Sequence, residues 1–517
     1  MGPLTALTFF PLLGMIVILL LPKGRDNIIR WAAAAFTFVP LVISTVMIFD
    51  YNTALIGVND PNSFQFVEKH AWIGAYNINY YVGVDGISFP LVWLTALLSF
   101  LCIFASWGIT KSVKGYMAMF LLLETGMMGT FVALDFFLFY VFWEIMLLPM
   151  YFLIGIWGGP RRVYAAIKFF LYTLAGSVLM LLAMILLYQN TVDPVTGRHT
   201  FDMITMMNQA NQSDWLRATG TFLGYGIRSV LWMALFIGFA IKVPVFPFHT
   251  WLPDAHVEAP TAISVILAGI LLKMGTYGML RINFAILPDA TLYFTEFLAI
   301  LGVVNIVYGA FCAMAQKDLK KLVAYSSISH MGYVLLGMSA MTPAAINGAV
   351  FQMFNHGTIA AMLFLLVGVV YDRAHHREIN GFGGIGAVVP RYMGMFALAF
   401  FASLGLPGMS GFISEVLVFL GSYQTWPLYT IIAVFGIVIT AAYLLWTIQR
   451  VFFGPLNEKY KDLPDINGRE LFTLIPLAVI TIILGVYPHP VLNIISGSLN
   501  HLITLVQPAV SVALNGF

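Results

Sequence analysis

Four charged side chains lie inside long apolar stretches of the sequence. Glu144 is in the run Phe142-Trp-Glu-Ile-Met-Leu-Leu-Pro-Met150, and Lys242 comes directly before Val243-Pro244. Lys273 is in Gly269-Ile-Leu-Leu-Lys-Met-Gly275, and Glu415 follows a Gly-Leu-Pro-Gly turn. A charge at the bilayer centre costs about 2.5–3.5 kcal/mol on insertion scales, and such groups usually mark ion or substrate paths. The alternative is a set of buried ion pairs that fix helix packing, although such pairs are poor stabilisers.

The two lysines favour the proton as the transported ion. Burial weakens the hold of an ammonium group on its proton, and a nearby carboxylate restores it. A Lys beside a Glu can therefore load and release a proton near neutral pH, whereas an Arg stays protonated. Lys168 fits two interpretations equally well. It is a neighbour of Glu144, or a helix-end residue whose ammonium reaches the membrane surface.

Three histidines form a second set of candidates: His249, His330 and His356. A single His on an apolar helix is usually a packed core residue, but three of them near interrupted or polar segments favour a relay. Their spacing does not match a metal site. Asp254 and His256, in Trp251-Leu-Pro-Asp-Ala-His256, are predicted to cap the entry to the next helix. A cytoplasmic entry for protons is the alternative there.

The composition indicates what must position these groups. Hydrophobic residues make up 60% of the 517 positions and charged residues 9%, and the mean hydropathy is +0.89. Soluble domains carry about 25% charged residues, so the chain is predicted to be an all-α integral membrane protein. The two Cys residues exclude a disulfide framework or a Cys-rich iron–sulfur site, and the net charge of +2 does not suggest nucleic-acid binding. The first apolar run, from Leu4 to Leu21, is predicted to be a retained helix.

A helix needs about 20 apolar residues to cross a bilayer, and roughly fourteen segments qualify. We expect one membrane domain over 1–517 with short connections, apart from longer ones at 50–83 and 189–228. The expected spans are 3–21, 29–49, 84–107, 115–133, 135–157, 165–188, 229–249, 260–284, 294–314, 320–340, 343–370, 391–423, 428–452 and 470–487.

Lys and Arg residues predict the orientation, because they gather in cytoplasmic loops. With the N-terminus outside, 17 of the 25 Lys and Arg residues fall in cytoplasmic loops and 5 on the outer side. Both termini are therefore expected outside. The five outer residues are Lys69, Arg198, Arg217, Arg228 and Arg281.

Two interrupted helices indicate an internal repeat. Span seven is broken by Ile241-Lys-Val-Pro-Val-Phe-Pro-Phe-His249, and span twelve is broken between Leu404 and Glu415. Paired broken helices in corresponding positions point to a transport site, and a spacing of five spans inverts the second copy. The predicted repeats cover 115–284 and 294–452, and 470–517 is expected to form a C-terminal helix and tail.

No enzyme site of its own is expected on this chain. The Gly-rich stretch Gly381-Phe-Gly-Gly-Ile-Gly386 lies between membrane helices and lacks the preceding strand of a nucleotide loop. No Ser/His/Asp constellation is apparent.

Around the same residues the sequence resembles a known family, the antiporter-like subunits of respiratory complex I and of multisubunit cation/proton antiporters. The matching motifs are specific when taken together, and the likeness covers essentially the whole chain. Within the family it is most similar to the M-type subunits of bacterial NADH–quinone oxidoreductases, since only about 30 residues follow the last span, too few for the lateral helix of an L-type subunit. The motifs are Phe142 to Phe152, Phe248-His-Thr-Trp-Leu-Pro-Asp-Ala-His256 with Ala259-Pro-Thr261, Leu322 to Gly332, and Gly405 to Glu415.

This resemblance implies a chain of proton sites across the membrane centre. Glu144 and Lys242 would form a coupling pair, and Lys273 a central relay with His249, His330 and His356 near it. Glu415 would be the terminal site of the second half-channel.

The resemblance also implies partners and a location. The chain would lie in the bacterial cytoplasmic membrane beside L- and N-type subunits. It would carry no cofactor, because FMN, iron–sulfur clusters and quinone would be bound by other subunits. The alternatives are a subunit of a sodium/proton antiporter, a ferredoxin- or hydrogenase-linked relative, and a structural spacer that moves no ions.

Overall fold

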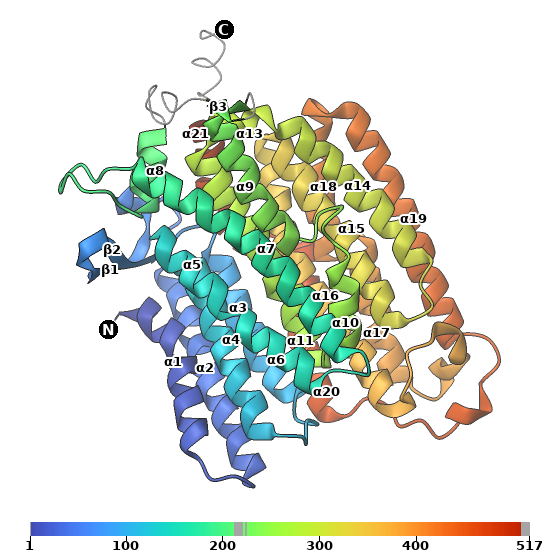
Figure 1. Cartoon of the computed structure of the whole chain (residues 1–517). Helices are drawn as coiled ribbons and strands as arrows, with labels where there is room; N and C mark the ends of the chain where they lie inside the picture. The colour runs from blue at the N-terminus through green and yellow to red at the C-terminus, as the bar shows by residue number, and fades with distance from the viewer. Residues whose placement is uncertain (1, 211–220, 223–224, 508–517) are drawn as a thin grey trace.

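The computed structural model describes residues 2–210, 221–222 and 225–507, and the outer-side Arg217 lies outside that set. Long helices packed side by side form the body of the molecule (Figure 1). The unbroken long helices are α1 (Pro3–Leu20), α2 (Asp26–Asp50), α3 (Phe89–Ala105), α4 (Val113–Val132), α7 (Arg162–Gln189), α14 (Thr295–Met314), α15 (Leu319–Ala340), α16 (Pro343–Ala374), α19 (Pro427–Phe452), α20 (Gly468–Val486) and α21 (His489–Val506).

Ten helices of the described chain are long and apolar enough to cross a membrane. The other four expected spans differ for identifiable reasons. The helix α3 has only 17 residues, and α15 carries several Ser, Lys and His residues. The remaining two are interrupted, as α9 (Ile227–Lys242) with α10 (Trp251–Glu258), and as α17 (Pro390–Leu404) with α18 (Ser410–Thr425). Both predicted interruptions are confirmed.

Two further spans are continuous but irregular. The span 136–157 divides at Met146 into α5 (Phe136–Ile145) and α6 (Leu147–Trp157). The span 261–284 alternates α-helix and π-helix, as α11 (Thr261–Ile266), η3 (Leu267–Leu271), α12 (Leu272–Gly278) and η4 (Met279–Phe284), and it is completely buried. Single π turns often occur at functional sites because they reorient side chains. Lys273 lies between the two π segments.

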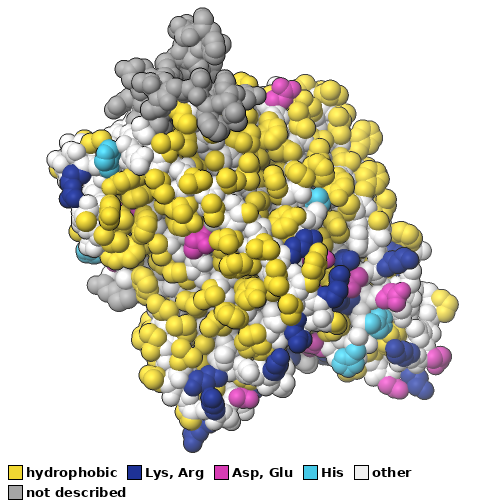
Figure 2. Space-filling model, viewed as in Figure 1, with side chains coloured by type: hydrophobic (Ala, Val, Ile, Leu, Met, Phe, Trp, Pro, Cys, Tyr) yellow, Lys and Arg dark blue, Asp and Glu magenta, His cyan; other side chains and the backbone are white. Residues whose placement is uncertain are grey.

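The surface fits a membrane environment. Large apolar side chains cover the middle of the face shown in Figure 2, whereas Lys and Arg gather towards its lower end. Exposed apolar side chains are abundant on α2, α7 and α19. A soluble monomer rarely exposes a continuous apolar patch of this kind.

The described chain is mostly helical, as predicted, but the 50–83 connection contains an antiparallel hairpin that was not expected, with β1 (Gln65–Ile73) paired to β2 (Ile78–Val84). A second small pair, β3 (Thr221–Phe222) with β4 (Tyr225–Gly226), follows α8 (Met203–Ala210). The predicted C-terminal tail also begins with a helix, α21, beyond α20. Short helical segments complete the fold at η1 (Pro61–Ser63), η2 (Gly74–Tyr76), α13 (Pro288–Tyr293), η5 (Ile379–Gly381), η6 (Ile385–Ala387) and η7 (Glu458–Tyr460).

The hairpin is fastened to the first helix by one carboxylate. Glu68 on β1 accepts hydrogen bonds from the backbone N–H of Gly2 (2.8 Å) and Thr5 (2.9 Å), and from the Thr5 hydroxyl (2.7 Å). These are free N–H groups at a helix start, which favour negative charge. Burial disfavours the ionised form of Glu68, but the hydrogen bonds from Thr5, Gly2 and Leu4 outweigh it and lower the pKa of this carboxyl.

This geometry predicts a pH dependence of hairpin docking. Because the pKa of Glu68 is lower in the folded protein than in the unfolded chain, its contribution is present above the ordinary pKa and is lost as the pH falls below about 4.5. Glu68→Gln at pH 7 should reproduce that loss, of the order of 0.5–1 kcal/mol locally. Hydrogen exchange at the first amides of α1 measures it. Equal protection in Glu68→Gln and the unchanged protein from pH 7 to pH 4 would refute the anchor.

A second fastening lies where β2 meets α3. Asp85 accepts hydrogen bonds from the backbone N–H of Ile87 and Ser88 (3.1 Å each), and its Oδ1 lies 2.5 Å from the Arg281 guanidinium. Both side chains of this ion pair are at most 2% exposed. Arg281, which was counted among the outer-side residues, is a buried residue of η4, and its charge is paired with Asp85.

Candidate functional site

The first helix break is held open by an amide from another helix. After α9 ends at Lys242 the chain runs irregularly to Trp251, and Asn305 of α14 pairs with that segment. The Asn305 amide donates to the Pro244 carbonyl (3.3 Å), and its oxygen accepts from the Phe246 N–H (2.9 Å). Non-helical backbone at membrane depth persists only where protein or water satisfies its polar groups. This contact explains how Lys242 can stand at a helix end inside the bundle.

The second break places Glu415 in a similar way. The chain turns at Gly405 (φ +77°) and Gly408 (φ +94°), a region that favours glycine, before α18 begins. Asn355 of α16 donates to the Ser410 carbonyl (2.9 Å) and to the Ser414 hydroxyl (3.1 Å). A Cβ at Gly405 would approach a Glu415 carboxylate oxygen to 2.9 Å, so the turn and the carboxylate are packed together.

Four of the predicted residues form one buried cluster. The Lys273 ammonium lies 2.6 Å from His356 Nδ1 and donates to the Ala268 carbonyl (2.5 Å). The His356 and His330 rings are 5.8 Å apart between centroids. His330 Nδ1 lies 3.3 Å from a Glu415 carboxylate oxygen, and His330 Nε2 lies 3.1 Å from the Ser403 hydroxyl. The cluster therefore joins α12, α16, α15 and α18.

A gap in this cluster is about the size of a water molecule. A cavity of ≈ 10 Å³ is lined by His330, His356, Gln352, Ser326 and Glu415, among others. A single water needs about 10–15 Å³ and two to four polar partners. Imidazole rings 5.8 Å apart cannot hydrogen-bond directly, so one water in this cavity would complete the line from Lys273 to Glu415.

Glu144 and Lys242 lie further along the molecule. Lys242 is 1% exposed, and its ammonium faces the rings of Trp143 (5.0 Å to the centroid) and Phe169 (5.6 Å). Among the described side chains, none hydrogen-bonds to this ammonium, and the acidic group that acts on it electrostatically is Glu144. Glu144 itself is half-buried and contacts Tyr140, one turn earlier on α5.

Two predicted residues have neighbours that were not expected. Lys168 of α7 pairs with Asp254 of α10 (2.7 Å), a partner that neither of its expected roles includes. His249 lies in the first break against Phe246 and Tyr308, with ring centroids at 5.8 and 5.2 Å, and Lys168 is the charge that acts on it. The structure therefore groups His249 with Lys168, and not with the Lys273 cluster.

The predicted cap before span eight is also wrong. Asp254 binds Lys168, and Pro260 is the residue that precedes α11. His256 is fully buried, stacks on Phe364 at 4.4 Å, and has no hydrogen-bond partner on either ring nitrogen within the described structure. Lys320 and Lys273 are the charges that act on it.

The sequence prediction missed a buried acid on α4. Glu124 of α4 is 0% exposed, and neither carboxylate oxygen has a hydrogen-bond partner in the described chain. Its position inside the expected span 115–133 was a sufficient signal, because it is a charge in an apolar run like the other four. No group of three or more His, Cys, Asp or Glu side chains that could hold a metal ion occurs among the described residues.

Comparison with known proteins identifies the family. A family model described as "NADH:quinone oxidoreductase/Mrp antiporter, TM" matches residues 133–440. A second, described as "NADH-ubiquinone oxidoreductase chain 4, amino terminus", matches residues 28–134. The chain belongs to the NADH:quinone oxidoreductase/Mrp antiporter family.

Relatives within this family match nearly end to end. NADH-quinone oxidoreductase subunit M of Rhodobacter capsulatus is 44% identical, over 97% of this chain and 96% of its own length. Its namesake from Rickettsia conorii is 41% identical, over 96% and 97%. These matches confirm the resemblance that the sequence motifs indicate.

Solved structures agree. A chain of respiratory complex I from Thermus thermophilus with bound NADH superposes with a TM-score of 0.83 and 26% identity, over 97% of this chain and 99% of the other. A chain of the Mrp complex from a Dietzia species gives a TM-score of 0.79 at 20% identity, with 99% coverage of both, and shows the shared fold.

Proposed function

We propose that this chain is a proton-translocating membrane subunit of an NADH–quinone oxidoreductase. The observation that carries the proposal is the buried line from Lys273 through His356 and His330 to Glu415. Each member can take up and give back a proton, and neighbouring members are linked in turn by a hydrogen bond, a water-sized cavity and a 3.3 Å contact between His330 and Glu415. The near full-length relatives named as NADH-quinone oxidoreductase subunit M support the assignment of the redox complex in which this chain works.

Within this function the residues take distinct roles. Lys242 lies at the buried end of a broken helix, and Glu144 is the acidic group that acts on its ammonium. Lys273 is the central relay, and Glu415 is the terminal site held by His330. Lys168 acts through Asp254, because that ion pair ties α7 to the broken helix that carries Lys242.

The architecture completes the proposal. Five spans from α4 to η4 and five from α14 to α19 form two inverted repeats, each with its fourth span broken and each break held by an Asn side chain. About fourteen spans cross the bacterial cytoplasmic membrane, with both termini on the outer side. The Lys and Arg residues at one end of the molecule support that orientation (Figure 2).

The energy source lies outside this chain in the proposed assembly. Other subunits, including L- and N-type membrane neighbours, bind FMN, the iron–sulfur clusters and quinone, and this chain has no redox chemistry of its own. Glu144 of α5 is half-buried, and it would be the residue through which such a neighbour acts on this chain.

Glu144→Gln tests the proposal in membrane vesicles that contain the whole complex. Gln keeps the shape of Glu144 but cannot hold the negative charge that acts on Lys242. We expect NADH-driven proton translocation to fall at least tenfold, because positioned proton-transfer groups contribute about 10²–10⁴-fold to a rate. A pH-sensitive dye inside the vesicles reports the rate.

Glu296→Gln is the matched control, because Glu296 is exposed and binds only Tyr429 among the described residues. Unchanged translocation in Glu144→Gln would remove the assigned role. Sodium-driven proton release without NADH would favour the antiporter alternative.

A further inference from the structure

We propose that Glu124 is a further proton-loading site, filled from a vestibule at the cytoplasmic end of the bundle, that supplies the Lys273–His356 pair. This inference deepens the proposed function and depends on it. None of the roles assigned above uses Glu124.

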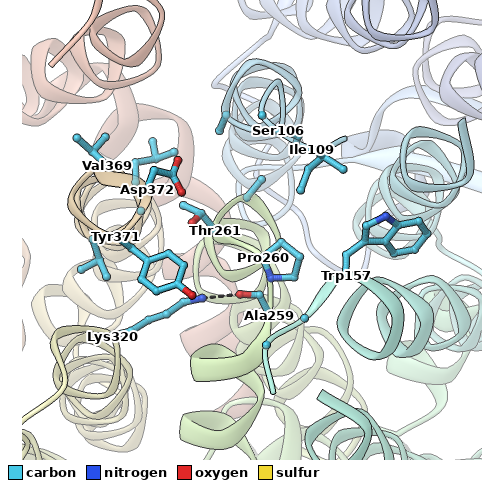
Figure 3. Close-up of a pocket in the computed structure, with 18 of the residues that line it drawn as sticks. Ser106, Ile109, Trp157, Ala259, Pro260, Thr261, Lys320, Val369, Tyr371 and Asp372 are labelled. Atoms are coloured by element: carbon cyan, nitrogen blue, oxygen red, sulfur yellow. Dashed lines mark hydrogen bonds between the residues drawn. The ribbon is translucent and has the colours of Figure 1, made fainter. Parts of the chain in front are cut away.

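The vestibule is a cavity of ≈ 530 Å³ between the two halves of the chain. Figure 3 shows Ser106, Trp157, Thr261 and Lys320 around it, with the Lys320 ammonium bonded to the Ala259 carbonyl. Tyr371 and Asp372 on its wall are exposed, so water can reach the space. Its lining carries both acids and bases, including Glu258, Glu470 and Arg469, which suits proton collection better than the binding of one charged ligand.

A polar face leads from this vestibule into the membrane. The Ser106 hydroxyl, on the vestibule wall at the end of α3, lies 3.0 Å from the Tyr116 hydroxyl at the start of α4. The two helices run antiparallel from that pair. Ser99 is seven residues from Ser106, and Glu124 is eight from Tyr116, about 10 and 12 Å along the helix axes. Ser99 and Glu124 therefore lie at a similar depth on neighbouring helices.

Ser99 and Glu124 are both completely buried, and the Ser99 hydroxyl and both Glu124 oxygens lack partners in the described structure. Between them and Ser106 lies the Cys102 thiol, which points to the Ala262 carbonyl (3.6 Å) and is acted on by the Glu124 charge. Unsatisfied buried polar groups cost about 1–3 kcal/mol each. The unpartnered groups of Ser99 and Glu124, at a similar depth on neighbouring helices, are accounted for if water enters from the vestibule or if Glu124 holds a proton.

The same layer of α3 touches the central relay. A Cβ at Gly269 would approach the side chain of Leu98 to 2.5 Å, and a Cβ at Gly357 would approach that of Leu94 to the same distance. Gly269 is one turn before Lys273, and Gly357 follows His356. Leu94 and Leu98, close to Ser99 on α3, therefore pack against the segments that carry Lys273 and His356, and α4 with Glu124 packs against α3.

The proton balance is simple. A proton leaves a water of the vestibule, passes the Ser106–Tyr116 hydroxyl pair and binds a Glu124 oxygen, which becomes a neutral acid. When Lys273 has lost its proton towards Glu415, the Glu124 O–H bond breaks, and the proton is transferred across the Ser99 layer to the Lys273 amine. The Glu124 carboxylate is then refilled from the vestibule.

Glu124→Gln in the intact complex tests this step. Gln imitates the neutral acid in size and polarity but cannot release a proton, so a merely structural Glu124 would tolerate it. We expect NADH-driven proton translocation to fall at least fivefold, while Glu124→Asp keeps most of it. Thr125→Val is the matched control at the same depth, since the Thr125 hydroxyl bonds to its own helix, at the Leu121 carbonyl.

Ser106→Ala provides a second readout. This change should slow the reprotonation of Glu124 from the vestibule and increase the solvent isotope effect on translocation in heavy water. Full translocation in Glu124→Gln, with strong loss in Lys273→Met measured alongside, overturns this inference alone; full translocation in both overturns the proposed function. If Glu124→Gln does not assemble, an unchanged isotope effect in Ser106→Ala overturns the inference.

Discussion

Replacing Lys273 by methionine is expected to reduce NADH-driven proton translocation at least tenfold. Lys273 is completely buried, and its ammonium holds His356 at 2.6 Å. Methionine fills similar space without a titratable group, so the bundle keeps its packing while the line to Glu415 loses its first member. Because translocation and quinone reduction are coupled in the proposed complex, NADH oxidation should fall in parallel. Both rates are measured on the same vesicles.

Lys69→Met is the control for this prediction. Lys69 is 47% exposed on the hairpin and pairs with Asp202, far from the cluster in sequence and in depth. It should leave both rates within twofold of those of the unchanged complex. Normal translocation by Lys273→Met would show that protons bypass the cluster.

Arg281→Met is expected to have the largest effect on stability. The change leaves the Asp85 carboxylate, which is 2% exposed, without its ion-pair partner. Breaking a buried pair from one side costs about 3–5 kcal/mol, because the remaining charge stays desolvated. The unfolding temperature of the purified complex in detergent, followed by tryptophan fluorescence, measures the loss of stability.

The double variant Asp85→Leu with Arg281→Met separates charge from packing. Replacing both partners by apolar groups often restores most of the stability. We expect the double variant to be more stable than Arg281→Met alone. If the two variants unfold alike, the loss comes from packing of the long Arg side chain against Phe64 and Tyr277, whose ring centroids lie 5.3 and 5.5 Å from its guanidinium carbon.

The parts of the site that follow from local pattern could be predicted. Lys242, Lys273 and Glu415 stand out because an apolar run tolerates few charges, and the breaks beside Pro244 and Gly405 follow from residues that end helices. The clustering of His330 and His356 with Lys273 needed the family resemblance as well, since 83 residues separate Lys273 from His356.

What could not be predicted depends on contacts between distant segments. Nothing near Lys168 in the sequence indicates that Asp254, 86 residues away, is its partner. Arg281 lies near the end of the expected span 260–284, and nothing beside it in the sequence indicates that Asp85, 196 residues away, is its partner. The hairpin itself was hidden because most side chains of β1 are exposed or half-buried, so this strand carries little hydrophobic pattern.

The most direct test of the central claim, a wet proton path inside this chain, is a high-resolution density map of the intact complex. We expect ordered water in the cavity between His356 and His330, and along the line from Lys242 through Lys273 to Glu415. That water should lie at hydrogen-bond distance from both rings. A dry line, with apolar side chains filling the cavity and the Lys273 ammonium turned away from His356, would contradict the claim and favour a spacer that moves no ions.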